Sequence, residues 1–222
     1  MHRWDIINWL IGKYGYKTYL EIGVEKGDCF MRVEYEQQTG VDPDPESPAD
    51  IHETSDVFFY DLLVDEFEIG KPHVEYDIIF IDGDHHEGQV IKDINNSLDH
   101  LAEGGTIVVH DCNPPTAQHA AEKPMIFKQR NDGSEYFVWN GTVWKAFVMT
   151  RLFRKDLQCR CVDADWGCGI IQRGEWIPYK GQMYSRDATE EHLTFPIFDK
   201  RRVEYLNLIT PEAFKEIYNG PD

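Results

Sequence analysis

Hydrophobic residues in the first half of the chain follow two patterns in turn. Continuous apolar runs at 18–24, 76–84 and 106–111 are typical of strands that are buried on both faces. The segments 57–67 and 87–101 instead carry apolar residues at spacings of three and four, which indicates helices with one buried face. Strands and helices therefore alternate, and this order predicts a parallel sheet covered by helices on both sides.

Weaker patterns fill the stretches between these segments. We expect a helix over 27–38, a very short strand over 39–45 and a further strand over 49–55. Gly104 and Gly105 are expected to end the helix that precedes them. The first half thus predicts an α/β fold with a Rossmann-like, doubly wound, mostly parallel sheet.

The second half is less regular. Segment 142–155 is strongly amphipathic and predicts a helix. Two alternating stretches follow at 157–165 and 168–174, with only Trp166 and Gly167 between them. This spacing predicts an antiparallel hairpin at one edge of the sheet.

The remaining segments contain few periodic signals. Residues 131–141 are turn-rich and aromatic, and the only helix expected after the hairpin is a short one near 210–220. The chain has no internal repeat, low-complexity tract or linker. We therefore expect one domain over 1–222, with its core at about 18–174 and with 175–222 packed on it as an extension.

Composition narrows the class of protein. The chain has 222 residues, of which 41% are hydrophobic, so it can form a core and is not disordered. It has neither a run of about 18 apolar residues nor a leader-like start, so we expect a cytoplasmic protein without membrane contact. The five cysteines are an odd number without zinc-knuckle spacing, which disfavours a disulfide framework and a cysteine metal cluster.

Charge is distributed unevenly along the chain. The whole net charge of −18 lies in residues 1–111, where 25 acidic residues stand against 7 basic ones. Such a surface repels phosphate backbones, which disfavours a nucleic-acid partner. The neutral half contains Arg151, Arg154 and the basic run 200–202, and we expect an acidic or phosphorylated acceptor to bind there.

Polar residues gather where the predicted strands end. In an open parallel sheet, ligands bind at the carboxyl ends of the strands, near the point where the strand order reverses. The residues at these ends are Glu21, Gly23, Gly27, Asp42, Thr54, Ser55, Asp56, Asp82, Asp84, His85, His86, His110 and Asp111. Each also has a structural interpretation, because glycines serve tight turns and carboxylates cap helices or face solvent. There are more such residues at the strand ends than these structural roles require, so the sequence predicts a ligand site there.

The segments that carry these residues resemble a known family. TYLEIGVEKGD, GVDPDP, ETSDVFF, the stretch from YDIIFIDGD to VVHDCNP, and WNGTVWKAF together look like class I S-adenosylmethionine-dependent methyltransferases. More narrowly, they are similar to the metal-assisted branch of catechol-type and macrolide-sugar O-methyltransferases. The resemblance covers about residues 18–174 and is most specific between Ile81 and Asp111. It implies methyl transfer to a hydroxyl of a small acceptor, which is a sugar, a glycan unit or a phenol.

The resemblance also implies a set of cofactor-binding residues. These are Glu21, Gly23, Gly27, Asp42, Ser55, Asp56 and Asp82. Glu21 and the two glycines would line the methionine part of S-adenosylmethionine, and Asp42 would hold its ribose. Ser55 and Asp56 would lie near its adenine.

Catalytic roles follow from the same likeness. His85 matches the general base, with Asp82 beside it, and Asp82 and Asp111 match the carboxylates that bind a divalent ion such as Mg²⁺. His110 stands where one subgroup has a further acidic ligand, so it joins the implied metal set. Cys112 stands where catechol-type members have an asparagine. These two departures leave the metal open.

The chemistry of the acceptor bears on that open question. An imidazole of pKa about 6.5 that faces an aliphatic hydroxyl near ~15.7 meets a gap of about 9 pH units, which is roughly 12 kcal/mol. A phenol near pKa ~10 reduces the cost to about 5 kcal/mol, within reach of a histidine alone. A metal requirement would therefore favour a sugar-type alcohol.

Two other functions remain open at this point. A nucleotide-dependent oxidoreductase or epimerase would use the same kind of sheet, although its G-x-G-x-x-G fingerprint is absent after the first strand. A binding module that holds the cofactor without methyl transfer would have no use for a base at His85. The sequence identifies neither the acceptor nor the oligomeric state. A homo-oligomer is one of the states that stay open.

Overall fold

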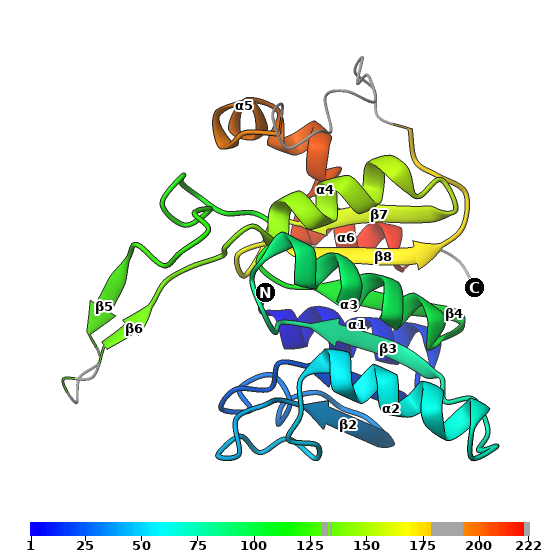
Figure 1. The fold of residues 1–222 in the computed structure, drawn as a ribbon. Coiled ribbons are helices and arrows are strands. Elements are labelled where there is room, and N and C mark those ends of the chain that lie inside the picture. The colour runs from blue at the N-terminus through cyan, green and yellow to red at the C-terminus, as the bar shows by residue number, and fades with distance from the viewer. Residues whose placement is uncertain (130–132, 134, 179–192, 220–222) are drawn as a thin grey trace.

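The computed structural model describes residues 1–129, 133, 135–178 and 193–219 (Figure 1). The helices are α1 (Arg3–Tyr14), α2 (Ser55–Phe67), α3 (Glu87–Asp99), α4 (Val143–Phe153), α5 (Phe195–Leu206) and α6 (Pro211–Ile217). The strands are β1 (Thr18–Ile22), β2 (Gln37–Val41), β3 (Tyr76–Ile81), β4 (Leu101–Val109), β5 (Phe127–Gln129), β6 (Glu135–Phe137), β7 (Leu157–Val162), β8 (Cys168–Arg173) and β9 (Leu208–Ile209).

Seven of these strands form one sheet in the order β2-β1-β3-β4-β8-β7-β9. Its pairs are parallel except for the two that involve β8, which runs against β4 and β7. The chain moves outward from β1 to β2 and then crosses to β3 on the other side of β1, so the strand order reverses between β1 and β3. The predicted Rossmann-like sheet and its antiparallel hairpin are confirmed, and the two-residue β9 lies outside that hairpin.

Helices cover both faces of the sheet, because successive side chains of each buried strand point to opposite sides. Ile79 and Ile81 of β3 belong to the core that α2, α3 and α4 cover. Ile78 and Phe80 belong to the core on the other face, with α1 and α6. Figure 1 shows these two layers, with α2, α3 and α4 in front of the sheet and α1 and α6 behind it.

The predicted helix over 27–38 is wrong, since the segment forms turns and then enters β2. Two of its backbone hydrogen bonds are local, from Met31 to Gly27 and from Arg32 to Cys29. The segment is also held by α1, because the Asn8 side chain donates to the carbonyl of Arg32 and accepts from the amide of Glu34, at 2.9 and 2.7 Å. These tertiary contacts take the place of the further local hydrogen bonds that a full helix would need.

The predicted strand over 49–55 is reduced to one bridge, between Ile51 and Val41. The short strand expected over 39–45 is present as β2, but it ends at Val41. Thr54 is a helix cap, because its hydroxyl accepts from the amide of Val57 at the start of α2.

Gly104 and Gly105 do not end a helix. α3 ends at Asp99, and β4 begins at Leu101, so the glycine pair lies within the strand. The register between β3 and β4 shifts near this point, which is a usual place for glycine in a strand.

Sequence patterns missed several elements outside the sheet centre. α1 and α5 had no predicted counterpart, whereas the short helix near 210–220 is present as α6. The hairpin of β7 and β8 has a five-residue turn, 163–167, in place of the two residues expected.

A second small sheet lies beyond the core. β5 and β6 pair into an arm, residues 125–138, that extends from the body of the molecule (Figure 1). The turn-rich segment predicted over 131–141 therefore contains a short strand, and part of it falls outside the described residues. Among the helices described, none has the length and apolar character that a bilayer crossing requires.

Candidate functional site

The site lies at the carboxyl ends of β1, β3 and β4, beside the point where the strand order reverses. Two adjoining pockets open there and share Gly23, Glu25, Asp82 and His85. Gly23 has a positive φ of 87°, and a Cβ atom on it would clash with the carbonyl oxygen of Asp82. Only glycine therefore lets the turn after β1 lie against the end of β3.

His85 follows β3 and is oriented by a residue from a distant part of the chain. Its Nδ1 lies 3.0 Å from the carbonyl oxygen of Trp139, and its ring stacks on the Trp139 indole at 5.2 Å. A carbonyl only accepts, so Nδ1 carries the proton and the neutral ring leaves Nε2 as an acceptor. Nε2 lies 3.5 Å from Oδ2 of Asp111 and 3.7 Å from Oδ1 of Asp82.

The two carboxylates change the basicity of His85. Burial by itself would lower the pKa of His85, but the negative charges of Asp82 and Asp111 outweigh burial and raise it. The side chain keeps 21% of its surface exposed, toward the pocket.

Asp82 also faces two cationic groups. Its Oδ1 accepts from Nδ1 of His110 at 3.0 Å, and Arg3 Nε lies 3.8 Å from Oδ2. Burial would raise the pKa of Asp82, whereas His110 and Arg3 lower it, and the net effect is a strong decrease. Asp82 is therefore a carboxylate whose charge the protein itself compensates.

Most of the groups around His110 favour its protonated form. Its Nδ1 faces Asp82, and its Nε2 lies 2.7 Å from the carbonyl oxygen of Asp165, so both nitrogens meet acceptors. Nη1 of Arg3 also lies 3.0 Å from the same Nε2, and because a guanidinium only donates, this contact by itself would favour an unprotonated Nε2. Burial disfavours the cation, yet Asp82 and Asp111 raise the pKa of His110 well above its usual value.

Asp111 is fixed by both its backbone and its side chain. It adopts a left-handed φ of 62°, which is uncommon outside glycine. Its Oδ1 accepts from Nδ2 of Asn140 at 2.6 Å, and the residue is 6% exposed. Oδ2 remains directed toward His85 and His110, at 3.5 Å from each.

The larger pocket, about 610 Å³, contains most of the predicted cofactor residues. Gly23, Asp42, Ser55, Asp56 and Asp82 line it.

Within this pocket the polar groups already have protein partners. Asp42 accepts from the backbone amides of Glu25 and Asp44. Ser55 donates to Asp93, and Asp56 accepts from Lys92 at 3.0 Å.

Glu21 belongs to the second pocket, of about 390 Å³. It is 1% exposed and accepts from the Tyr19 hydroxyl, and burial raises its pKa to about 8. A buried carboxyl of this kind gains from a nearby positive charge.

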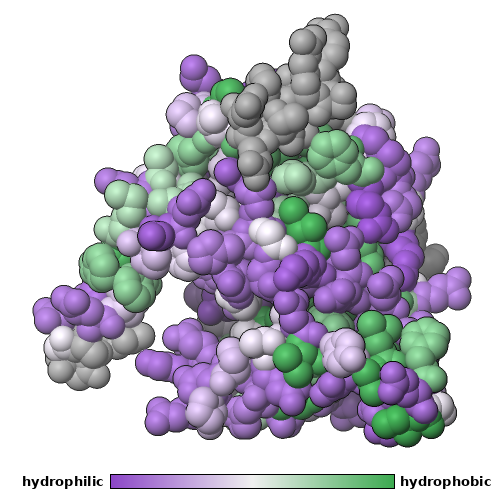
Figure 2. All heavy atoms as spheres, in the orientation of Figure 1, coloured by the Kyte–Doolittle hydropathy of each residue, from purple (hydrophilic) through white to green (hydrophobic). Residues whose placement is uncertain are grey.

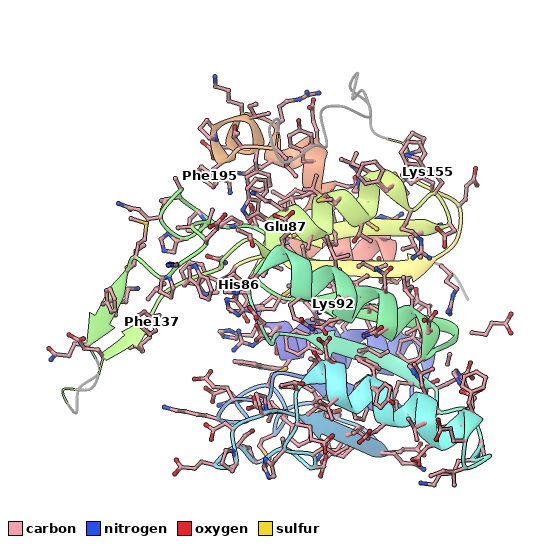
Figure 3. All side chains as sticks on the ribbon, in the orientation of Figure 1. His86, Glu87, Lys92, Phe137, Lys155 and Phe195 are labelled. Atoms are coloured by element: carbon pink, nitrogen blue, oxygen red, sulfur yellow. The ribbon has the colours of Figure 1, made fainter. Side chains whose placement is uncertain are left out.

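Other predicted residues lie elsewhere. Gly27 lines neither pocket and packs against Pro48. His86 is exposed and pairs with Asp84 at the start of α3, where Figure 3 labels it beside Glu87.

The basic residues at which the acceptor was expected, Arg151, Arg154 and the run 200–202, are also absent from the residues that line these pockets. Arg151 is buried and donates to the carbonyl of Glu204, and Arg202 donates to Asn113. The expectation that an anionic acceptor binds among them is therefore not supported by their position.

Several residues that line the second pocket had no assigned role in the sequence. They are Arg3, Lys128, Tyr136, Trp139, Asn140 and Trp166. Arg3 lies on α1 and Trp166 on the β7–β8 turn, so no local pattern connects them with His85. The motif around Trp139 and Asn140 was part of the resemblance, but their contacts with His85 and Asp111 were not readable.

A group of three side chains has the geometry of a metal site. One ligand atom each from Asp82, His85 and Asp111 lies within 4.8 Å of the other two. The group contains His85 in place of the predicted His110, whose two nitrogens face protein acceptors. Asp82 and Asp111 are thus brought together as expected, and metal binding by His110 stays a prediction.

Comparison with known proteins finds a likeness over part of the chain. Residues 20–112 match a family model described as a methyltransferase domain. Among curated proteins, no match is found.

Solved structures with a similar fold include an O-methyltransferase from Bacillus cereus in complex with SAH. It has 13% sequence identity and a TM-score of 0.49, over 76% of this chain and 78% of that one. A SAH-bound methyltransferase from Podospora anserina has 17% identity and a TM-score of 0.49, over 78% of each chain. The matched segment, 20–112, contains Glu21, Asp42, Asp82, His85 and Asp111, and over this segment the resemblance to methyltransferases is confirmed.

Proposed function

We propose that the chain is an S-adenosylmethionine-dependent O-methyltransferase that acts on a hydroxyl of a small acceptor, with His85 as the general base. The observation that carries the proposal is the orientation of the His85 ring. Trp139 holds Nδ1, and Nε2 faces the pocket between the carboxylates of Asp82 and Asp111. A passive binding module has no need for a base held in one tautomer.

The two pockets support one place for the nucleoside part of the donor and an adjoining one where its methionine part would meet the acceptor. The pocket of Asp42, Ser55 and Asp56 suits the nucleoside part of the cofactor, and its carboxylates disfavour a phosphate on the ribose. Glu21 lies next to it, where the positively charged methionine part would stabilise the carboxylate form.

Methyl transfer requires alignment more than activation, because the sulfonium already has a good leaving group. Placement of donor and acceptor in line supplies up to roughly 7–11 kcal/mol. As the acceptor oxygen bonds to the methyl carbon, the sulfur–carbon bond breaks and its electron pair stays on sulfur. The hydroxyl proton passes to Nε2 of His85, and Asp82 and Asp111 stabilise the imidazolium that forms.

A divalent ion fits the spacing of the acidic group, and Asp82, His85 and Asp111 would hold it. Such an ion would lower the pKa of a bound hydroxyl. The same Nε2 cannot both bind an ion and accept the proton. Because His110 and Arg3 already compensate Asp82, we propose that His85 serves as the base and that transfer proceeds without an added ion.

The acceptor pocket gives the size of the proposed substrate. At about 390 Å³ it would hold the methionine part of the donor beside an acceptor no larger than a single ring with substituents. Tyr136, Trp139 and Trp166 supply flat apolar surface on its lining. Without a metal, the smaller proton-transfer cost favours a phenolic hydroxyl over a sugar hydroxyl.

The test compares two neighbouring histidines. Wild-type protein, His85→Asn and His86→Asn are incubated with isotopically labelled S-adenosylmethionine and a pool of hydroxylated metabolites, and products are identified by mass spectrometry. We expect His85→Asn to reduce turnover by about 10²–10⁴-fold with cofactor affinity nearly unchanged. His86→Asn, whose side chain is exposed, should remain near wild type.

Three outcomes would contradict the proposal. Near-normal turnover in His85→Asn would remove the base assignment. Tight cofactor binding without any methylated product would indicate a binding module. Saturable binding of NAD in place of S-adenosylmethionine would indicate an oxidoreductase or epimerase.

A further inference from the structure

The outer face of α2 is apolar although it faces solvent. Tyr60 and Phe67 are 63% and 77% exposed, and Val57 is 45% exposed. The opposite side of the same helix packs into the core through Phe58 and Phe59, which are nearly fully buried. Figure 2 shows hydrophobic residues on the surface at the position of α2 in Figure 1. The helix is therefore apolar on both faces, and only one face has a partner among the described residues.

These three exposed residues, together with the partly buried Val64, have the spacing of a helix-pairing seam. Val57, Tyr60, Val64 and Phe67 follow one another at intervals of three, four and three residues, as the a and d positions of a heptad do. A scattered exposed side chain needs no explanation, but four apolar residues at successive a and d positions form one stripe along the helix. This pattern fits a second helix laid along α2.

The positions beside the seam determine which helix fits. With Val57 and Val64 at a, the e positions are Asp61 and Glu68, and one g position is Asp56. Lys92 already pairs with Asp56, whereas Asp61 and Glu68 have no ion pair within the described part of the chain. A partner with lysine or arginine at its own e and g positions would complement these two charges.

A second copy of this chain is a poorer partner. It would bring acidic residues to the same seam, so that Asp56, Asp61 and Glu68 would meet one another. The net charge of −18 adds repulsion between copies and attraction toward a basic partner. We propose that the outer face of α2 is a docking surface for a basic amphipathic helix of another protein.

The docking surface is connected with the pocket assigned to the cofactor. Ser55 and Asp56, at the first turn of α2, line that pocket, and the seam begins one residue later at Val57. A helix on α2 would thus lie next to the cofactor pocket without covering His85. The surface itself does not depend on methyl transfer.

The experiment uses the full chain and two synthetic probe peptides. Each peptide has three heptads with leucine at a and d; one carries lysine at e and g, and its twin carries glutamate. Binding is measured by fluorescence anisotropy at low and at moderate salt. We expect the lysine peptide to bind at least about tenfold more tightly than the glutamate peptide.

Variants then separate the seam from general charge attraction. Tyr60→Ala with Phe67→Ala should weaken binding of the lysine peptide at least about tenfold, and Asp61→Lys with Glu68→Lys should reverse the peptide preference. The matched controls are Phe153→Ala, an exposed apolar residue on α4, and Glu212→Lys with Glu216→Lys on α6. Circular dichroism verifies that every variant is folded.

Each contrary result would overturn the proposal. These results are equal binding of the two peptides, unchanged binding after the Tyr60 and Phe67 substitutions, and a reversal of preference by the α6 control. A dimer in sedimentation that Tyr60→Ala with Phe67→Ala abolishes would identify a second copy as the occupant.

Discussion

His85 owes its proposed role to neighbours from separate parts of the chain. Trp139 fixes the tautomer through a 3.0 Å contact, and Asp82 and Asp111 set the basicity of the ring. A lone histidine after a strand would have neither property. The side chain becomes a candidate base only because three other residues converge on it.

We expect the rate of methyl transfer to rise with pH, since only neutral His85 can accept a proton. Asp82 and Asp111 raise the pKa of His85 despite its burial, so the midpoint of kcat/KM should lie above the ordinary value of about 6.5. Asp111→Asn removes one negative charge and should move that midpoint to lower pH. A pH–rate profile measures both effects, and an unmoved midpoint in Asp111→Asn would contradict this assignment.

Removal of metal tests whether His110 and Arg3 balance the negative charge of Asp82 without a bound ion. We expect turnover after dialysis against EDTA to stay within about twofold of that of the untreated protein, because His110 and Arg3 already balance the charge of Asp82. Adding Mg²⁺ or Mn²⁺ back is the control. A loss above about tenfold that either ion restores would assign the group of Asp82, His85 and Asp111 to a divalent ion.

At the scale of elements, the turn after β1 depends on one glycine. Gly23 has a positive φ and lies against the backbone of Asp82, whereas Gly12 in α1 has open space around its α-carbon. Gly23→Ala should reduce the free energy of unfolding by at least about 2 kcal/mol through backbone strain and the clash. Gly12→Ala should increase it by up to about 1 kcal/mol.

Denaturant unfolding of the two alanine variants measures this contrast. Cofactor affinity should fall only in Gly23→Ala, because that glycine lines both pockets. Equal stability of the two variants would mean that the turn can relax around a side chain.

Element types were predictable where the periodicity was long and the burial uniform. β3, α3 and α4 satisfy both conditions, and each was found close to its predicted range. The segment 27–38 has helical spacing, but the Asn8 side chain hydrogen-bonds to its backbone. The spacing of apolar residues cannot reveal a contact with a residue so far away along the chain. α1 was missed for a related reason. Which of its residues are buried is decided by its packing against the sheet.

Charge acts at the scale of the whole molecule. The excess of 18 negative charges repels itself in the folded state, and added salt screens that repulsion. We expect NaCl to raise the unfolding midpoint at pH 7, at roughly 2–4 °C per kcal/mol gained.

Thermal unfolding at several salt concentrations is the measurement. The control is the same series near pH 5, close to the isoelectric point of about 4.8, where the gain should nearly vanish. An equal gain at both pH values would attribute the effect to general salting-out, not to net charge.

The sequence by itself determined the class of fold, the edge of the sheet at which the candidate site lies, and the residues after β1, β3 and β4 that contribute to it. Those features depend on local periodicity and on the rule that parallel strands end at one edge. Only the tertiary structure decided how that site is completed: Arg3, Trp139 and Asn140 come from segments far from His85 along the chain. Tautomer, charge compensation and pocket walls are properties of contacts in space, and such contacts leave no periodic trace in the sequence.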